Sequence, residues 1–511
     1  MSNITITTPL YYVNDKPHLG STYTTIASDA YARFQRLNGN KVIFITGVDE
    51  HGQKIQRTAA SNKTTPKNHC NTISQKYKSL WEKWSISNDY FIRTTDPHHQ
   101  KLVERFFQRV QSKGDIRVGN QQGWYCIGCE EYKEESKDSS KPLCPIHLKE
   151  LEWRDEENLF FCLSNYQTQI ENLLQNPEFI QPKSRRNEII NFVSKGLKDF
   201  SISRLKLDWG IPVPGYDGHT FYVWFDALLG YISALLPKGQ EIDLEDLNDF
   251  SWPPEIHIIG KDILRFHAVY WPAMLLSADL DLPRKVFGHG FLTREGQKMG
   301  KSLGNVLDPE LLLNKYGEDA IRWYLLSDFR FGQDGDFQQK RFIDLVNNDL
   351  ANTIGNLLNR TSSMSRKWFS NKVPDFNYDS NEEDLKNLSI NTIIEVKGYL
   401  EDLCFKEACS SILNLASSAN LYLNDNKPWT LIKEDKNKAR VGFCLYNVLE
   451  TIRIVAILIN PILPKLSKDI LNQLSYDHNR IDWKIDLEWG KLKKSSSLPK
   501  PSPILVKLED E

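Results

Sequence analysis

The stretch ITITTPLYYVNDKPHLGSTYTTIASDAYARFQRLNGNKVIFITGVDEHG, residues 4–52, decides the fold. Ile4 and Ile6 alternate with polar residues, which indicates a β-strand. The apolar positions that follow have helical spacing and predict a helix with one buried face. These positions are Tyr23, Ile26, Ala27, Ala30, Tyr31, Phe34 and Leu37. Asn38-Gly39 ends this helix, and residues 42–45 form a short apolar strand. A strand, a crossover helix and a buried strand make a βαβ unit of a parallel sheet.

The composition is that of a soluble globular protein with several domains. The 511 residues suggest three or four domains or subdomains at roughly 150 residues each. Hydrophobic residues make up 40% and charged residues 25%, which excludes a disordered, collagen-like or coiled-coil chain. The net charge is −2, so any nucleic acid must be held by local basic patches.

Cysteine usage and the amino terminus point to a cytoplasmic protein. Eight cysteines are too few for a disulfide scaffold, and the first residues lack the features of a signal or transit peptide. The longest apolar run, residues 454–459, is far shorter than the ~20 residues that cross a bilayer. We therefore expect no membrane partner.

The order of the strand and helix patterns predicts an α/β fold. Apolar strands return at residues 256–259 and 285–292, whereas long helical patterns fill residues 345–368, 393–423 and 439–459. We expect a Rossmann-like parallel-sheet domain that is split by an insertion and followed by an all-α helical bundle. The expected boundaries are 1–114 and 226–345 for the two halves of the sheet domain, 115–225 for the insertion, 346–475 for the bundle and 476–511 for a partly disordered tail.

A metal-ligand pattern lies inside the predicted insertion. Its spacing is Cys126-x2-Cys129-x14-Cys144-x2-His147, which offers three thiolates and one imidazole in two close pairs. Such a set suits one tetrahedral Zn²⁺, and four protein ligands leave no open position, so the site would be structural. The segment 126–147 has little apolar material, so metal binding would supply much of its folding energy. The alternative is four unrelated residues in a polar loop.

Two short motifs can bind phosphate. His18-Leu19-Gly20-Ser21 follows the first strand at the start of the first helix, where free N–H groups and the helix dipole attract anions. Lys298-Met299-Gly300-Lys301-Ser302 lies in a glycine-rich loop, from which two lysines can reach phosphate oxygens. Either motif alone is more often a capped loop or a solvated loop. The two together are far more informative than either motif alone.

The pair of motifs resembles the HIGH and KMSKS signatures of class I aminoacyl-tRNA synthetases. Longer segments, from about residue 4 to about residue 470, resemble the methionyl-tRNA synthetases. These segments are TTPLYYVNDKPHLGS (7–21), FITGVDEHGQKI (44–55), YVWFDALLGY (222–231), GKDILRFHAVYWPAML (260–275) and KMGKSLGNV (298–306). The family carries a zinc knuckle within its catalytic domain, at the place of the Cys3His set.

The resemblance implies a ligase that activates methionine with ATP and Mg²⁺ to methionyl-adenylate. The methionyl group would then pass to the 3′ end of methionine tRNA, initiator and elongator, which carries a CAU anticodon. The protein is expected to be a monomer, because the chain lacks the appended tRNA-binding and dimerising domain of some family members. The first step needs mostly positioning and charge stabilisation.

The resemblance also implies three sets of site residues. The ATP-binding set, in which His18, Lys298 and Lys301 would be catalytic, is His18, Gly20, Ser21, Lys298, Lys301 and Ser302. The methionine pocket would be formed by Leu10, Tyr12, Asp49, Trp224, Ala227, Tyr231, Ile263, Phe266, His267 and Trp271. The anticodon would be bound by Asn356, Arg360 and Trp429. Asp49 can pair with the ammonium, and the aromatic rings can enclose the polarizable thioether. Asn and Arg can read base edges, and Trp can stack on a base.

Two positions depart from the family signatures. Position 21 is Ser where the signature has a second His, and position 300 is Gly where it usually has Ser. Two rival functions remain open. One is another class I synthetase or nucleotidyltransferase with a similar sheet. The other is a non-catalytic tRNA-binding paralogue, suggested by Ser21, although the retained Lys298, Lys301 and Asp49 favour an active enzyme.

Overall fold

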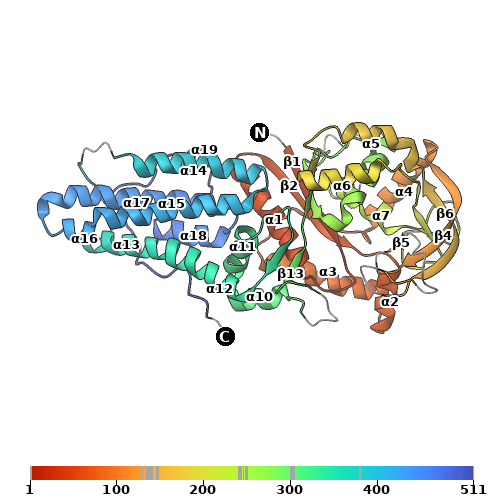
Figure 1. Cartoon of the computed structure of the whole chain (residues 1–511), viewed down its shortest axis with the longest axis horizontal. Coiled ribbons are helices and arrows are strands. Elements are labelled where there is room, and N and C mark those ends of the chain that lie inside the picture. Colours follow the sequence, from red (N-terminus) through yellow and green to blue (C-terminus); the bar gives the residue numbers. More distant parts are fainter. Residues whose placement is uncertain are drawn as a thin grey trace. The chain divides into compact units, whose positions relative to one another are not determined.

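The computed structural model describes residues 3–509, apart from 129, 134–141, 145–148, 240–243, 245–246, 248–250, 300–304 and 379–381. The chain forms two compact units (Figure 1). The first, here called the sheet unit, comprises Asn3–Ser28 and Val42–His289. The second, here called the helical unit, comprises Met1–Ser2, Asp29–Lys41 and Gly290–Glu511.

The sheet unit contains a six-stranded sheet in the order β3-β2-β1-β11-β12-β7. Its strands are β1 (Asn3–Tyr12), β2 (Lys41–Asp49), β3 (Tyr90–Arg93), β7 (Ile180–Gln181), β11 (Ile256–Gly260) and β12 (Val286–His289). The pairs β1–β11, β11–β12, β12–β7 and β2–β3 are all parallel, with Ile6 opposite Ile256. The predicted Rossmann-like parallel sheet is therefore confirmed.

Helices of the sheet unit connect these strands and cover the sheet. They are the first part of α1 (Leu19–Leu37), α2 (Gln53–Ser61), α3 (Pro66–Lys83), α4 (Pro97–Ser112), α5 (Gln167–Leu173), α6 (Lys183–Val193), α7 (Val223–Ala227), α8 (Gly230–Ser233) and α9 (Trp271–Ser277). The strand order reverses between β1 and β11, because β2 and β3 extend the sheet on one side and β12 on the other. Ligands of such sheets bind at the carboxyl ends of the strands beside this reversal.

The segment predicted as an insertion builds a second sheet of antiparallel pairs. Its strands, in the order β5-β4-β6-β8, are β4 (Ile116–Cys126), β5 (Glu131–Lys133), β6 (Glu152–Phe161) and β8 (Phe200–Ser201). A two-stranded ribbon of β9 (Ser203–Leu205) and β10 (His219–Phe221) follows. The segment is not wholly separate, since β7 belongs to it and pairs with β12 at the edge of the parallel sheet.

The helical unit holds a small three-stranded sheet, β14-β13-β15, and the predicted helical bundle (Figure 1). Its strands are β13 (Leu292–Arg294), β14 (Gln297–Lys298) and β15 (Gly335–Phe337). Its helices are α10 (Pro309–Tyr316), α11 (Glu318–Ser327), α12 (Gln339–Val346), α13 (Asn356–Trp368), α14 (Asp384–Glu401), α15 (Phe405–Asn426), α16 (Pro428–Leu431), α17 (Lys438–Ile459), α18 (Pro464–Gln473) and α19 (Trp483–Asp486). The helical pattern over residues 393–423 is divided between α14 and α15 at Leu403, whose φ is 57°.

Helix α17 is the central helix of the bundle. The stretch Asp435–Ile459 has the length and apolar character of a membrane-spanning helix, but 94% of its most apolar window is buried inside the protein. It packs against α13, α14, α15 and α18, so apolar residues are needed all round it. The tail that the sequence predicts to be partly disordered is described up to Glu509, and it buries Leu492 and Leu498.

A completely buried ion pair joins separate segments of the helical unit. The Arg322 guanidinium of α11 donates to Asp29 in the second part of α1, at 2.7 Å, and both side chains are 0% exposed. Arg322 Nε also donates to the Ile462 carbonyl oxygen in the turn between α17 and α18, at 2.6 Å. One side chain thus satisfies groups from two distant segments.

Replacing Arg322 by Met should destabilise the helical unit by up to about 3–5 kcal/mol, because Asp29 stays buried and loses its buried guanidinium partner, while Arg33, whose Nε lies 2.9 Å from the same carboxylate oxygen, remains paired with it. The measurement is urea-induced loss of helical circular dichroism. Lys386→Ala is the matched control, since its ion pair with Glu383 is solvent-exposed and such pairs contribute less than about 1 kcal/mol. Equal midpoints for the two variants would contradict the role assigned to Arg322.

Candidate active site

The first phosphate motif lies where the sequence places it, between β1 and α1. Helix α1 begins at Leu19, earlier than the apolar spacing predicts. The His18 N–H donates to Ser21 Oγ at 3.1 Å, and the Ser21 hydroxyl donates to the His18 carbonyl oxygen at 2.7 Å. Ser21 is buried and closes this turn, whereas the His18 side chain is exposed. A Cβ at Gly20 would lie 2.9 Å from the His18 ring, so a larger residue there would force the His18 side chain to move.

The second phosphate motif lies mostly outside the described residues. Strand β14 ends at Lys298, whose side chain is not described, and residues 300–304, including Lys301 and Ser302, are also outside. Their predicted role in ATP binding therefore stays a prediction.

Four of the predicted methionine-pocket residues form one aromatic cluster in the sheet unit. The rings of Trp224 and Phe266 are stacked, with centroids 4.0 Å apart and an 8° angle between the planes. His267 lies edge-on to Trp224 at 6.2 Å, and the Tyr231 ring is 5.8 Å from His267. Phe266 begins a π-helical turn that runs to Tyr270, a geometry that often marks functional sites.

His267 and Tyr231 satisfy one another's polar groups. Burial lowers the pKa of His267 to about 4, so its imidazole is neutral near pH 7. Its Nδ1 lies 3.1 Å from the Ile263 carbonyl oxygen, which can only accept, so Nδ1 carries the proton. Nε2 is then an acceptor, and the Tyr231 hydroxyl donates a hydrogen bond to it at 2.9 Å. The hydroxyl oxygen of Tyr231 keeps its lone pairs.

The other predicted pocket residues are placed on neighbouring elements. Leu10 of β1 packs so closely on Gly230 that a Cβ there would lie 2.4 Å from its Cδ1. Ala227 ends α7 and is buried. Trp271 is also buried, but its described ring neighbours are Phe106 and Trp252 rather than the aromatic cluster. The indole Nε1 of Trp271 has no hydrogen-bond partner among the described residues.

Buried carboxylates gather at the carboxyl end of β2, and they differ in their partners. Glu50 accepts from Arg93 Nε at 2.9 Å and from the hydroxyls of Ser74 and Thr95. Asp49, which is 7% exposed, accepts a single hydrogen bond within the described part of the chain, from the His51 N–H at 3.4 Å. Burial raises the pKa of Asp49 well above its usual range, and the negative charge of Asp226 raises it further. Asp49 is therefore the carboxylate that a bound cation would stabilise most.

Asp226 is held between two histidines, which the sequence analysis missed. His51 Nδ1 and His99 Nε2 each lie 2.6 Å from one oxygen of this completely buried carboxylate. Burial raises the pKa of Asp226, but the two histidines outweigh burial and hold that pKa below its usual range. These two hydrogen bonds to Asp226 join α4, α7 and the turn after β2. No periodicity in the sequence marks them, because the residues come from three separate segments.

Two of the four predicted metal ligands are described. Cys126 and Cys144 are both buried in one small cluster with Leu151, against which Trp124 packs. Cys129 and His147 lie outside the described residues. Within the described residues no group of three or more potential ligands is found. Two thiols buried in one cluster, from segments 18 residues apart in the sequence, fit the predicted zinc knuckle.

The predicted anticodon residues lie in the helical unit. Arg360 of α13 donates to Asn424 Oδ1 at 3.0 Å, and its guanidinium carbon is 5.8 Å from the centroid of the Trp429 ring. Trp429 lies on α16 and is 40% exposed, which is unusual for so large an apolar side chain. Asn356 is exposed one turn before Arg360. The structure thus brings Arg360 and Trp429 together, with an open aromatic face.

Comparison with known proteins gives matches over almost the whole chain. The family model "tRNA synthetases class I (M)" matches residues 4–145 and 133–362, and "Anticodon binding domain of methionyl tRNA ligase" matches residues 373–511. The methionine–tRNA ligase of Synechocystis sp. is 52% identical over 99% of this chain and 97% of its own length. The chloroplastic/mitochondrial methionine–tRNA ligase of Arabidopsis thaliana is 49% identical over 99% of this chain and 83% of its own length.

A solved structure gives the same result. Mycobacterium tuberculosis methionyl-tRNA synthetase in complex with methionyl-adenylate has a TM-score of 0.94 and 37% identity, and the match covers 99% of this chain and 100% of that one. Both halves of the chain match the two family models in order, and the Synechocystis relative is matched over nearly its whole length. The chain belongs to the methionyl-tRNA synthetase family of class I tRNA synthetases.

Proposed function

We propose that the chain is a methionine–tRNA ligase whose amino-acid site is built around Asp49. Its curated relatives of nearly full length are methionine–tRNA ligases, and a solved relative holds methionyl-adenylate. The main support for this site is that the buried carboxylates differ in the number of their hydrogen-bond donors. Within the described residues, Glu50 and Asp226 each accept from two or more side-chain donors, whereas Asp49 accepts from one backbone N–H at 3.4 Å. A buried carboxylate in that condition is suited to an ammonium group.

The aromatic cluster would receive the side chain of methionine. Trp224, Phe266 and His267 offer apolar faces to a thioether, and sulfur interacts favourably with aromatic rings. The Tyr231 hydroxyl donates its hydrogen bond to His267, so it has only acceptor lone pairs left for the substrate. The thioether sulfur of methionine has no donor to offer them. Recognition there would rest mainly on shape and dispersion, and less on a polar contact.

Activation joins methionine to ATP at the α-phosphate. An oxygen of the methionine carboxylate attacks the α-phosphorus, the bond between the α-phosphorus and the α,β-bridging oxygen breaks, and pyrophosphate leaves. His18, Gly20 and Ser21 at the start of α1 would bind phosphate, with Lys298, Lys301 and Ser302 from the second motif. Mg²⁺ would neutralise charge on the pyrophosphate side. In the second step a ribose hydroxyl of the tRNA 3′ end attacks the methionyl carbonyl and displaces AMP.

The deciding experiment is ATP–pyrophosphate exchange with each amino acid in turn. Exchange that requires methionine supports the proposal. Exchange with another amino acid would favour a different class I synthetase, and tRNA binding without any exchange would favour a non-catalytic paralogue. The cytoplasmic location and the monomeric state stay predictions.

The pH dependence of methionine binding tests the role of Asp49. Its raised pKa means that the free enzyme takes up a proton at a higher pH than an exposed aspartate would, and the neutral carboxyl cannot pair with an ammonium. The KM for methionine should therefore rise as the pH falls from about 8 to about 5.5, with a much smaller change for ATP. Asp49→Asn should lose this dependence. A methionine KM that stays flat in the wild-type protein would exclude the assignment.

We also propose one structural Zn²⁺ held by Cys126, Cys129, Cys144 and His147. Bound there, the metal would supply folding energy to a segment with little apolar material. Metal analysis of the purified protein should give about one Zn²⁺ per chain, and Cys144→Ser should lose it and lower turnover. Cys162→Ser is the matched control, because Cys162 lies outside the set. Full activity in verified zinc-free protein would argue against a metal that supports the active site.

The bundle would select the tRNA through Arg360, Trp429 and Asn356. The exposed Trp429 face can stack on an unpaired base, a contact worth roughly 1–3 kcal/mol. Trp429→Ala should lower aminoacylation efficiency about ten-fold or more and leave ATP–pyrophosphate exchange without tRNA unchanged. Ile394→Ala, which truncates another exposed side chain of the helical unit, is the control and should acylate normally. A parallel fall in exchange and acylation would show that Trp429 supports folding instead.

A further inference from the structure

A buried glutamate links the zinc-knuckle segment to the pocket proposed for methionine. Glu130 is 5% exposed and directly follows Cys129 in the sequence. Its backbone has a φ of 55°, in the left-handed region that a residue with a Cβ seldom occupies. A non-glycine residue is kept in this region when its surroundings determine its position, and such residues cluster at functional sites.

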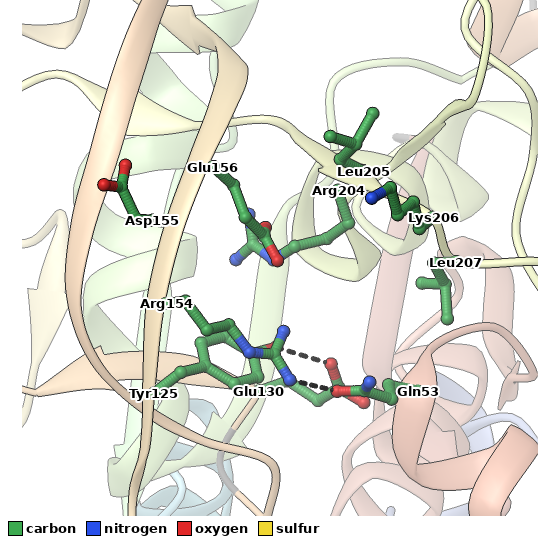
Figure 2. A pocket seen from close by; sticks show the side chains of 10 residues that line it. All are labelled: Gln53, Tyr125, Glu130, Arg154, Asp155, Glu156, Arg204, Leu205, Lys206 and Leu207. Carbon is green, nitrogen blue, oxygen red and sulfur yellow. Dashed lines mark hydrogen bonds between the residues drawn. The ribbon is translucent and has the colours of Figure 1, made fainter.

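Every oxygen of the Glu130 side chain has a donor from another element. Oε1 accepts from the Tyr12 hydroxyl at 3.0 Å and from the Lys54 N–H at 2.8 Å. Oε2 accepts from the Tyr125 hydroxyl at 2.8 Å, a contact that Figure 2 shows at one side of a polar cavity of about 390 Å³. The backbone carbonyl of Glu130 accepts from the Tyr222 hydroxyl at 2.7 Å.

These donors belong to the walls of the proposed active site. Tyr12 ends β1, Lys54 lies in the first turn of α2 just after Asp49, and Tyr222 precedes α7. Gly52 allows the approach, because a Cβ there would lie 2.6 Å from the Tyr12 hydroxyl and 3.0 Å from Glu130 Oε1. The φ of Gly52 is 111°, which also favours glycine. Three pocket-forming segments therefore meet at Glu130, two of them at its carboxylate and the third at its backbone carbonyl.

We propose that Glu130 is a positioning residue that fixes the Tyr12 hydroxyl and the turn after Asp49, so that the order of the knuckle segment sets the affinity for methionine. The inference rests on the proposed function. Glu130 would touch neither substrate, and it would act through Tyr12 and the first turn of α2. Phosphate binding at the start of α1 uses other residues, so the effect should be confined to methionine.

The test uses Glu130→Gln in the full-length protein, which keeps the shape but places an amide group against hydrogen-bond donors. The KM for methionine in ATP–pyrophosphate exchange should rise about ten-fold, whereas the KM for ATP and the kcat should change by less than about two-fold. The zinc content should stay at that of the wild type. Glu157→Gln is the matched control, because it removes an exposed charge from β6 of the same insertion and should change none of these values.

A double-mutant cycle with Tyr12→Phe separates positioning from general weakening. Tyr12→Phe removes the hydrogen bond to Glu130 Oε1, and Glu130→Gln removes the charge of its acceptor. Because both variants act through the same contact, the doubly substituted protein should have a methionine KM close to that of the more affected single variant. Multiplied effects of the two substitutions would overturn the inference. Equal rises in the KM for methionine and ATP, or loss of zinc in Glu130→Gln, would also overturn it.

The remaining outcomes are decided by the same assay. If Glu130→Gln does not purify as folded protein, Tyr125→Phe frees only Oε2 and should still raise the methionine KM about three-fold without affecting ATP; no change would overturn the inference. Absence of methionine-dependent exchange in the wild type would overturn the proposed function and this inference with it. Wild-type exchange with an unchanged methionine KM in Glu130→Gln would overturn this inference alone.

Discussion

Burial of several carboxylates beside the carboxyl end of β2 is the constraint on which the active-site architecture depends. An ionised carboxylate taken out of water must be paired, or it becomes costly. Glu50 pairs with Arg93, and Asp226 lies between His51 and His99. Glu130 accepts hydrogen bonds from the hydroxyls of Tyr12 and Tyr125. Each pairing draws a different segment to the same edge of the sheet. Asp49 is left with a weak partner, which makes it the place for a substrate cation.

Local patterns in the sequence are enough to predict the frame of this site. The strand, helix and strand of residues 4–45 obey short-range periodicity, and parallel pairing follows from their order. The start of α1 is also local, because His18 and Ser21 cap each other across one turn. The family resemblance predicts that Asp49 and several aromatic residues line the methionine pocket. Four of these aromatic residues do form one cluster in the structure.

Long-range pairings could not be predicted in this way. His99 and Asp226 are 127 residues apart, and neither stands in a motif of its own. Glu130 appeared only as one charge in a polar segment, and its burial depends on Tyr12 and Tyr125 rather than on neighbours of its own. Trp271 shows a different limit. Its spacing of four from His267 suggests one helical face, but a π-helical turn intervenes, and the Trp271 ring packs on Phe106 and Trp252.

The burial of α17 has a consequence for the biosynthesis of the chain. This helix is mostly apolar and largely buried, with one buried ion pair between Glu450 and Arg453, and it enters the bundle only after α13, α14 and α15 have been synthesised. A ribosome that stalls before residue 438 would release a polypeptide whose earlier helices expose the faces that α17 covers. A product that ends soon after residue 459 would hold α17 but lack α18, which packs on it. Such products would display an apolar surface that molecular chaperones and proteases recognise.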